Sequence, residues 1–558
     1  MYRTVERREQ RAGCHASLSR APRVPDAVLP AAIAAALAFG CGFGERPGDS
    51  SAQPSGRPNI LFVVWDTVRA DRMSLYGHTR ATTPRLDRWA EQATVFEDAV
   101  SAAGYTVPSH ASMFTGLHPS EHCASGEAAI LGAEHTTLAE ALRDAGYATF
   151  LYSENPHLSE HRRFTQGFER SEYPWSPAHY ERALAILKSK VRGDRSSELA
   201  DRVAAMERGE TQLTPWNVKA AGELAQEALL GFLDDLDGER PFFAFVNYME
   251  AHRPYIPPRR FRESFLEPAD VDASFQVDRS WNTIWEFTFG RRELSERDLE
   301  LTRATYDASL LELDELFAAL LEALDRRGAL DDTIVVLTAD HGEHLGDQHM
   351  FDHQSTLYQA ALRVPLVVAY PQRIAPGRRT EPVMNFDLFP TLLEIAGVPL
   401  PRPSPADARI GARSLLAPRA ERDRLAEEIT AESAGVLAMR RLHPSWDPTP
   451  WTRTQRALLR GRYKWIASSA GDAQLYDLRA DPGELLDLAA LREFDAAQMR
   501  EALEQATAGL PSCGTNEAPV VSQSERELLQ ALGYESPEEP SSPGSSGSSS
   551  AAQDSESR

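Results

Sequence analysis

Three separated segments of the chain concentrate the residue types that bind metal ions and attack esters. They read WDTVRAD from Trp65, YTVPSHASMFTG from Tyr105 and TADHGEHLGDQHMFDH from Thr338. The last segment holds four of the chain's 15 histidines, a density that a solvated loop does not require. Carboxylates and imidazoles gathered in this way are typical of a divalent-cation site.

The metal-type residues follow apolar runs that predict buried strands. Asn59–Trp65 (NILFVVW) leads directly to Asp66, and Thr333–Thr338 (TIVVLT) leads to Asp340 and His341. Unalternated apolar runs are typical of parallel strands that are covered on both faces. In such sheets ligands gather beyond the carboxyl ends of the strands. We therefore expect Asp66 and Asp340 to lie at a ligand-binding edge of an α/β sheet.

The middle segment places a hydroxyl nucleophile in a suitable position. Pro108 fits the first turn of a helix, so Thr106 would lie beside a helix N-terminus. Free backbone N–H groups and the helix dipole favour an anionic ester there, and the Thr106 hydroxyl could attack it. The alternative is that Thr106 only caps the helix.

The remaining patterns predict an α/β fold followed by a smaller unit. A helical pattern over Leu301–Leu324 lies between strand-like runs, which favours a mainly parallel central sheet flanked by helices. Beyond about Arg402, Leu458–Ile466 and Gln474–Leu478 predict short antiparallel strands joined by a turn. This indicates a C-terminal α+β subdomain with a short antiparallel sheet.

Composition excludes several classes of protein. The chain has 558 residues, of which 42% are apolar and 25% charged, so it has ample material for a folded core. Its net charge of -23 repels phosphate backbones, and nucleic acid is not an expected partner. With four cysteines, neither a disulfide-dense scaffold nor a CxxC zinc site is expected. Nothing in the sequence indicates an oligomeric state.

The first 41 residues predict a signal peptide. An arginine-rich start precedes Ala27–Phe43, an apolar stretch that is too short and too alanine-rich for a secure membrane span. Cys41 ends a loose bacterial lipobox, so a lipid on Cys41 would be the only link to a membrane. Ordinary cleavage and an uncleaved anchor are the alternatives. We expect export to the cell envelope, as a periplasmic protein or a membrane-anchored lipoprotein.

The sequence also predicts the domain boundaries, and the expected export makes one disulfide possible. Residues 42–57 are expected to be a linker, 58–400 the catalytic domain, 401–534 the C-terminal subdomain, and 535–558 a disordered tail rich in serine, proline and acidic residues. In an oxidising compartment Cys123 and Cys513 are the pair left in the mature chain, and a disulfide between them is a hypothesis.

These segments resemble the sulfatase branch of the alkaline phosphatase superfamily. NILFVVWDTVRADRMSLYG is similar to its first strand and metal loop, TVPSHASMFTG to its nucleophile segment, and TADHGEHLGD to its second metal loop. Further similar stretches are AHRPYIPP, LRVPL, DLFPTLLEIAGV and YKWIASSAGDAQLYDLRADPGE. The order and spacing of the segments also agree. The resemblance implies an alkaline-phosphatase-like core.

The resemblance also implies the roles of individual residues. One divalent metal ion would be bound by Asp66, Asp340, His341 and Thr106, and Thr106 would be the nucleophile. Oxygen and imidazole ligands favour Mn²⁺ or Zn²⁺, with Ca²⁺ or Mg²⁺ as alternatives. The substrate would be bound, and its leaving oxygen protonated or screened, by histidines opposite the nucleophile, His252 and His353, with His110 as a further substrate-binding residue.

The sequence departs from the sulfatase pattern at the nucleophile. True sulfatases carry a Cys or Ser, converted to formylglycine, in a CxPxR-type motif, whereas here Thr106, Pro108 and His110 stand there and Thr67 replaces the usual second acidic ligand. A threonine ester must be cleaved by a second attack, which favours phosphoesters, mono- or diesters, as substrates. The alternatives are a sulfuric ester hydrolase, a phospho-headgroup transferase and a non-catalytic binding lipoprotein.

Overall fold

The computed structural model describes residues 56–513, apart from 126–129, 193–199, 201–202, 205–207, 209–219, 237, 354, 371, 402–409, 419–420, 430–433 and 512. The chain divides into two compact units, Met1–Ser55 and Gly56–Arg558, and the first lies wholly outside the described residues. The signal peptide, most of the linker, residues 514–534 of the expected C-terminal subdomain and the tail at 535–558 lie outside the described residues and therefore stay predictions. Within the described part, no helix combines the length and the apolarity that crossing a membrane requires.

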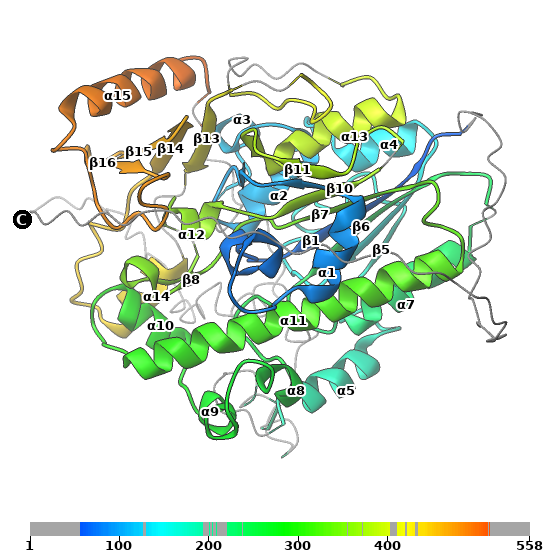
Figure 1. Ribbon diagram of the computed structural model, residues 1–558, viewed down its shortest axis with the longest axis horizontal. Helices are drawn as coiled ribbons and strands as arrows, with labels where there is room; N and C mark the ends of the chain where they lie inside the picture. Colours follow the sequence, from blue (N-terminus) through cyan, green and yellow to red (C-terminus); the bar gives the residue numbers. More distant parts are fainter. Residues whose placement is uncertain are drawn as a thin grey trace, which may run out of the picture. The chain divides into compact units, whose positions relative to one another are not determined.

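An eight-stranded sheet forms the centre of the second unit (Figure 1), in the order β11-β2-β10-β7-β1-β6-β4-β5. Its strands are β1 Asn59–Trp65, β2 Thr94–Phe96, β4 Ala148–Ser153, β5 Arg170–Glu172, β6 Phe242–Tyr248, β7 Thr333–Thr338, β10 Leu366–Ala369 and β11 Gly377–Arg379. Strand β1 runs parallel to β6 and β7, whereas β10 is antiparallel to both of its neighbours. The predicted mainly parallel sheet is confirmed.

Helices cover both faces of this sheet (Figure 1). On one face α2 (Thr106–Thr115), α4 (Leu138–Asp144) and α13 (Leu388–Ala396) contact one another. On the other face α11 (Glu296–Arg326) packs against α1 (Pro84–Trp89) and α7 (Glu223–Asp234). The helix predicted over Leu301–Leu324 lies within α11, which starts where the Ser295 side chain accepts a hydrogen bond from Asp298 N.

Shorter elements complete the core. The helices are α3 Pro119–His122, α5 Tyr180–Lys190, α8 Arg259–Arg262, α9 Pro268–Ser274, α10 Trp281–Thr288 and α12 Gln359–Leu362. Two small sheets pair β3 (Ala99–Val100) with β12 (Val383–Met384) and β8 (His344–Leu345) with β9 (Phe351–Asp352). The β8–β9 pair lies within the histidine-rich segment.

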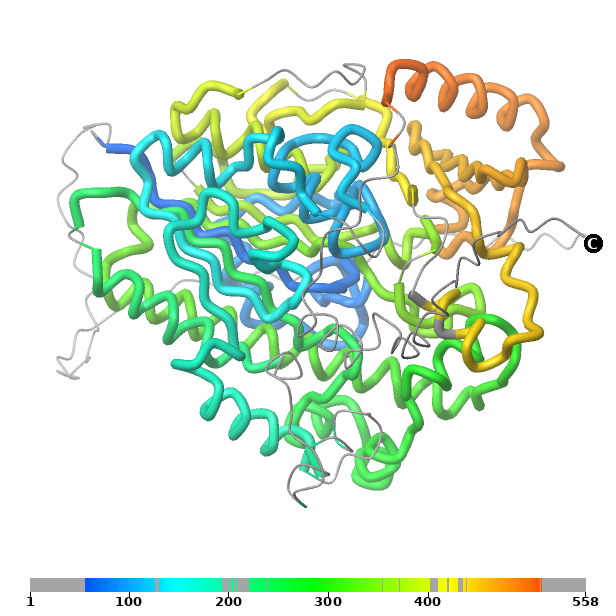
Figure 2. The backbone as a smooth tube through the Cα atoms, turned by 180° about the vertical axis from the view of Figure 1, so that it is seen from behind, coloured from blue at the N-terminus to red at the C-terminus, as the bar shows by residue number. Residues whose placement is uncertain are grey.

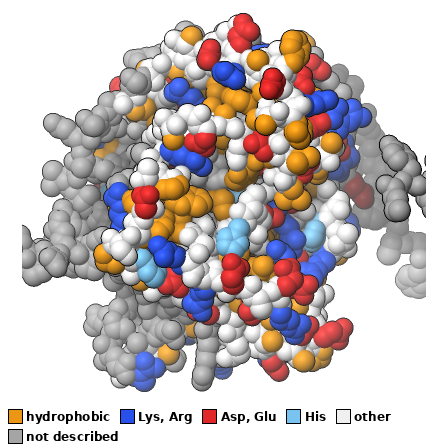
Figure 3. All heavy atoms as spheres, turned by 90° about the vertical axis from the view of Figure 1, so that its left-hand side faces the viewer, with side chains coloured by type: hydrophobic (Ala, Val, Ile, Leu, Met, Phe, Trp, Pro, Cys, Tyr) orange, Lys and Arg blue, Asp and Glu red, His pale blue; other side chains and the backbone are white. Residues whose placement is uncertain are grey.

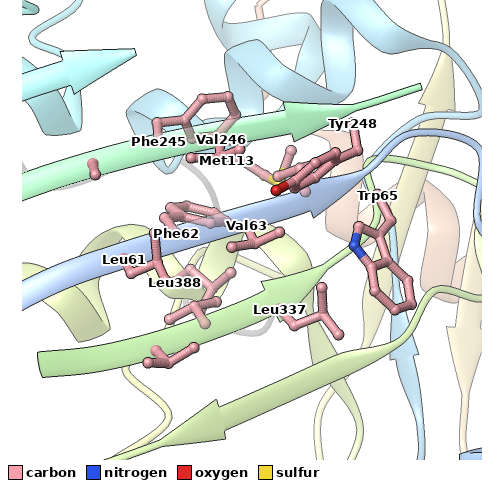
Figure 4. Packing of buried hydrophobic residues seen from close by; sticks show 14 of the residues in the cluster. Leu61, Phe62, Val63, Trp65, Met113, Phe245, Val246, Tyr248, Leu337 and Leu388 are labelled. Carbon is pink, nitrogen blue, oxygen red and sulfur yellow. The ribbon is translucent and has the colours of Figure 1, made fainter. Parts of the chain in front are cut away.

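Strand β1 is apolar from Ile60 onwards because that stretch has no exposed face. Figure 4 shows its side chains between those of β6 and β7, and the chain from Ile60 to Trp65 is completely buried. The rings of Phe62 and Phe245 meet edge to face with centroids 5.3 Å apart. Each buried side chain of this size contributes about 1.5–3 kcal/mol to folding. Figure 2 shows the same strand, near the start of the chain, running among strands from its middle.

A four-stranded antiparallel sheet lies in the C-terminal part of the chain. It consists of β13 Arg424–Glu428, β14 Gln455–Arg460, β15 Tyr463–Ser468 and β16 Ala473–Asp477. Helix α15 (Glu493–Thr507) packs on it through Met499 and Leu503, and α14 (Ala434–Leu442) contacts α10. The predicted short antiparallel sheet is confirmed, with β13 as a further strand.

The hypothesised disulfide is present. Cys123, directly after α3, is bonded to Cys513, which follows α15, across 390 positions of sequence. It joins the region beside α2 to the end of the C-terminal part.

Candidate active site

The structure brings together residues from two neighbouring strands. Asp66 follows β1, and Asp340 and His341 follow β7, which pairs with β1 in parallel. One ligand atom of each of the three lies within 4.8 Å of the others, and all three side chains are completely buried. This is the edge where the sequence places the metal-type residues.

Each carboxylate is held through one oxygen and leaves the other open. Asp66 Oδ2 accepts hydrogen bonds from Asn155 Nδ2 at 2.7 Å and Asn247 Nδ2 at 3.4 Å, while its Oδ1 has no hydrogen-bond partner among the described residues. Asp340 Oδ1 accepts from the backbone N–H groups of Thr67 and His341, and its Oδ2 is likewise without a hydrogen-bond donor in the described part of the chain. A buried oxygen without a donor is costly, so the pair suits a cation.

The electrostatics of the two carboxylates agree with this interpretation. Burial, and then the neighbouring Asp340 carboxylate, raise the pKa of Asp66 to about 7. Burial also raises the pKa of Asp340. Two buried carboxylates side by side therefore resist ionisation, and a divalent cation between them would remove that resistance.

His341 presents a nitrogen suited to a metal ion. Its Nδ1 donates to the carbonyl of Gly342 at 2.9 Å, so in the neutral ring Nε2 is unprotonated. Nε2 lies 3.3 Å from Asp340 Oδ2 and 3.3 Å from Thr106 Oγ1. Burial is the main cause that lowers the pKa of His341, to about 3, so the ring is neutral at neutral pH.

Thr106 is the first residue of α2, as Pro108 predicts, and it is almost completely buried. Its carbonyl accepts a hydrogen bond from His110 Nδ1 at 3.0 Å, and the same nitrogen lies 3.5 Å from Asp340 Oδ2. His110 is itself completely buried, and burial lowers its pKa. The structure therefore places the His110 ring against the Thr106 carbonyl and the Asp340 carboxylate.

Two polar side chains connect α2 and the loop after β7 that carries Asp340. Ser109 Oγ donates to the carbonyl of Asp340 at 2.6 Å, and Asn385 Nδ2 donates to the same oxygen at 3.2 Å. Neither residue is a sequence-based candidate. Both fix the distance between α2 and the loop that carries Asp340.

Thr67, which stands where the resemblance implies a second acidic ligand, stabilises the loop that follows β1. Thr67 adopts a positive φ of 60°, and its Oγ1 lies 2.7 and 2.9 Å from the carbonyl oxygens of Asp66 and Ala251. Its proton is thus directed to carbonyl groups, while its backbone N–H holds Asp340. Thr67 therefore fixes the loop through its hydroxyl and its backbone N–H.

His353 lies in a clamp of two carboxylates that sequence reasoning missed. Its Nδ1 is 2.8 Å from Asp352 Oδ1 and 3.4 Å from Glu343 Oε1, and its ring centroid is 4.5 Å from that of His341. Burial alone would lower the pKa of His353, but Asp352 and then Glu343 raise it well above its usual value. The ring is therefore an imidazolium at neutral pH.

The clamp also contains cationic side chains beside its carboxylates. Glu343, Asp352 and His353 lie close enough to form a second three-ligand group. However, Arg253 Nε also bonds Asp352 Oδ2 at 3.0 Å, so two cationic side chains face two carboxylates. The only signal in the sequence is that both acids lie in the histidine-rich segment.

His252 lies on the other side of His353. Its Nδ1 donates to the carbonyl of Arg253 at 2.6 Å, and its ring meets the His353 ring at 5.2 Å between centroids. The Arg253 guanidinium lies over the Trp281 ring at 4.5 Å. The two histidines assigned to the substrate therefore lie together, and His353 connects them to the metal-type group.

The arrangement defines a class of protein: an enzyme of α/β fold that places a hydroxyl at a helix N-terminus beside a buried Asp-Asp-His group. The chain belongs to the Sulfatase family, which it matches over residues 58–398. It is 25% identical to a choline-sulfatase of Rhizobium meliloti over 454 residues, which cover 78% of this chain and 83% of the relative. It is therefore an ester hydrolase of that family.

Solved structures show the same fold. A phosphonate monoester hydrolase of Agrobacterium radiobacter superposes with a TM-score of 0.61 at 23% identity, over 80% of this chain and 95% of its own. A protein in complex with its substrate D-glucosamine-2-N,6-O-disulfate gives a TM-score of 0.60 at 20% identity, over 81% of this chain and 98% of its own.

Proposed function

We propose that this protein hydrolyses anionic esters, with phosphoesters favoured over sulfate esters, and uses Thr106 as the nucleophile and one divalent metal ion as cofactor. The observation that carries the proposal is the 3.3 Å separation between Thr106 Oγ1 and His341 Nε2, beside two buried carboxylates that each have an open oxygen. Asp66, Asp340, His341 and Thr106 would hold the ion. When bound, it would lower the pKa of the Thr106 hydroxyl and offset charge on the ester oxygens. Mn²⁺ or Zn²⁺ is favoured, and Ca²⁺ or Mg²⁺ remains an alternative.

The chain's own residues supply the remaining chemistry. Thr106 Oγ1 forms a bond to the phosphorus or sulfur atom, the ester oxygen leaves, and water then cleaves the threonine ester. His353 is kept cationic by Asp352 and Glu343, so it can donate a proton to the leaving oxygen or screen its charge. His252 is its neighbour on the substrate side, and His110 positions Thr106.

Phosphoester preference is supported by the nucleophile itself. A threonine cannot form an aldehyde, so its ester has no route to release other than a second displacement. The fold shared with a phosphonate monoester hydrolase is compatible with phosphorus chemistry. Sulfate ester hydrolysis is the second candidate, favoured by the choline-sulfatase relative.

We also propose export to the cell envelope. The Cys123–Cys513 disulfide supports it, because disulfides persist in oxidising compartments.

The test compares matched aryl phosphate monoester, aryl phosphate diester and aryl sulfate, with added Mn²⁺, Zn²⁺, Ca²⁺ or Mg²⁺. Thr106→Ala should lower phosphoester turnover by at least ~1,000-fold. Thr115→Ala, the same change at the other end of α2, is the control and should retain turnover. Turnover that survives Thr106→Ala would overturn the nucleophile, and faster cleavage of the sulfate would overturn the phosphoester preference.

A further inference from the structure

A polar cavity lies between the core and the C-terminal sheet, with a volume of about 540 Å³. Its walls come from the turn between β2 and β3, from α12, from the start of β13, from the β14–β15 turn and from the segment after β16. We call it the seam cavity. It shares no lining residue with the candidate active site, and part of its wall lies beyond residue 398, outside the matched family region.

The seam cavity is lined by five arginines against three carboxylates. The arginines are Arg363, Arg422, Arg424, Arg462 and Arg479. This excess contrasts with a chain whose net charge is -23. On the face of the molecule drawn in Figure 3, acidic and basic side chains are interspersed. A concave surface with an excess of guanidinium groups attracts anions.

Two of these arginines are buried and incompletely paired. Arg422 bonds Asp387 at 2.8 Å, and Arg424 Nη1 donates to Asp98 Oδ1 at 2.6 Å. Only 8% of Arg422 and 2% of Arg424 are exposed, yet the Nε atom of each lacks a hydrogen-bond partner within the described residues. A buried cationic N–H without an acceptor is costly, so an anion that reached these groups would be favoured.

Two further arginines have guanidinium N–H donors that are not used within the described part of the chain. Arg363 Nη2 donates to the carbonyl of Glu97 at 3.3 Å, and the described residues contain no carboxylate paired with it. The exposed Arg479 side chain has no hydrogen-bond or ion-pair partner among the residues that the structure describes. Arg462 is different, because it is paired with Asp477. A ligand would thus meet guanidinium groups from several separate segments.

We propose that the seam cavity binds a tetrahedral oxyanion, phosphate or sulfate, either free or as the substituent of a larger molecule. Guanidinium groups bind such anions through paired, charge-assisted hydrogen bonds. The volume lies within the range of small-molecule sites and admits part of a carrier as well as the anion. The site is separate from the proposed function and does not depend on Thr106.

The test is calorimetric titration of the full chain with inorganic phosphate after removal of metal ions by EDTA, which silences anion binding that needs a metal. One phosphate should bind per chain. The double variant Arg363→Ala/Arg479→Ala, which removes the two arginines without a carboxylate partner among the described residues, should weaken this binding at least tenfold. Arg453→Ala removes a paired arginine that lies just before β14 and does not line the cavity, and it should bind phosphate like the wild type.

The outcomes separate the two proposals. Absence of phosphate and sulfate binding in the metal-free protein, or an equal loss in Arg453→Ala, would overturn the seam site whatever the catalytic assays give. Ester turnover should be unchanged in the double variant, which also reports that it is folded. Binding of glucose 6-phosphate more tightly than inorganic phosphate would identify a substituent as the ligand, and the reverse order would identify the free anion.

Discussion

Replacement of Asn155 tests how the metal-type group is held. Asn155 Nδ2 donates to Asp66 Oδ2 at 2.7 Å, and both residues are almost completely buried. This hydrogen bond stabilises the ionised carboxylate, which is the form that a cation requires, and it opposes the effects of burial and of Asp340 on the pKa of Asp66. Asn155→Ala should therefore weaken metal binding without removing a ligand.

The expected magnitude follows from the geometry. A short hydrogen bond to a buried charged group contributes about 1.5–3 kcal/mol. At about 1.4 kcal/mol per factor of ten, its loss should weaken metal binding by roughly 10- to 150-fold. Asn247 Nδ2 lies 3.4 Å from the same oxygen, so Asn247→Ala should have a smaller effect, of about fivefold or less.

The assay is competition for Mn²⁺ or Zn²⁺ against a chromophoric chelator, with thermal unfolding of each metal-free variant recorded in parallel. Asn155 Oδ1 also accepts the N–H of His157, so some loss of stability is expected and must be separated from metal affinity. Equal effects of the two variants, or unchanged metal affinity in Asn155→Ala, would refute the reasoning that Asn155 holds Asp66 in its ligand form.

Three further predictions concern stability. Lys464→Met removes the ammonium group that lies 2.7 Å from the buried Glu484 carboxylate. The free energy of unfolding, measured in urea, should fall by about 3–5 kcal/mol. Lys464→Met/Glu484→Gln should recover part of this loss, and no recovery would contradict the pairing. Replacing Cys123 and Cys513 by Ser opens a loop of 390 residues and should cost at most about 6 kcal/mol while turnover is retained; lost turnover at full folding would contradict this. Burial lowers the pKa of His122 from 6.5 to about 3, so the folded ring stays neutral while the unfolded chain takes up a proton below 6.5. Stability should therefore fall from pH 6.5 towards 3 by up to about 1.4 kcal/mol per unit, and this part of the pH dependence should be missing in His122→Asn.

The metal-type residues could be predicted because each follows a strand whose interior residues are all apolar. Asp66 and Asp340 come directly after apolar runs, and strand ends in parallel sheets gather ligands. Pro108 similarly placed Thr106 at the start of α2. These are local signals, and each needs only a few neighbouring residues.

The residues that hold this group could not be predicted, because their partners are distant in sequence. Asn247 is a single amide within the buried strand β6, and its hydrogen bond to Asp66 becomes evident only in the folded structure. Asp352 reaches His353 from a positive φ of 67°, a backbone conformation that the sequence does not indicate. The seam cavity likewise collects arginines from segments that are separate along the chain.

The position of β1 has a consequence for how the protein folds. This first strand pairs with β6 and β7, so Ile60 must find Phe243 and Asn59 must find Thr333. Such distant pairings close long loops before any contact offsets the lost chain entropy, which makes folding slow. Until residue 338 has emerged during synthesis, β1 lacks β7, one of its two neighbours in the sheet. The nascent chain therefore depends on protection from aggregation until its first strand is enclosed.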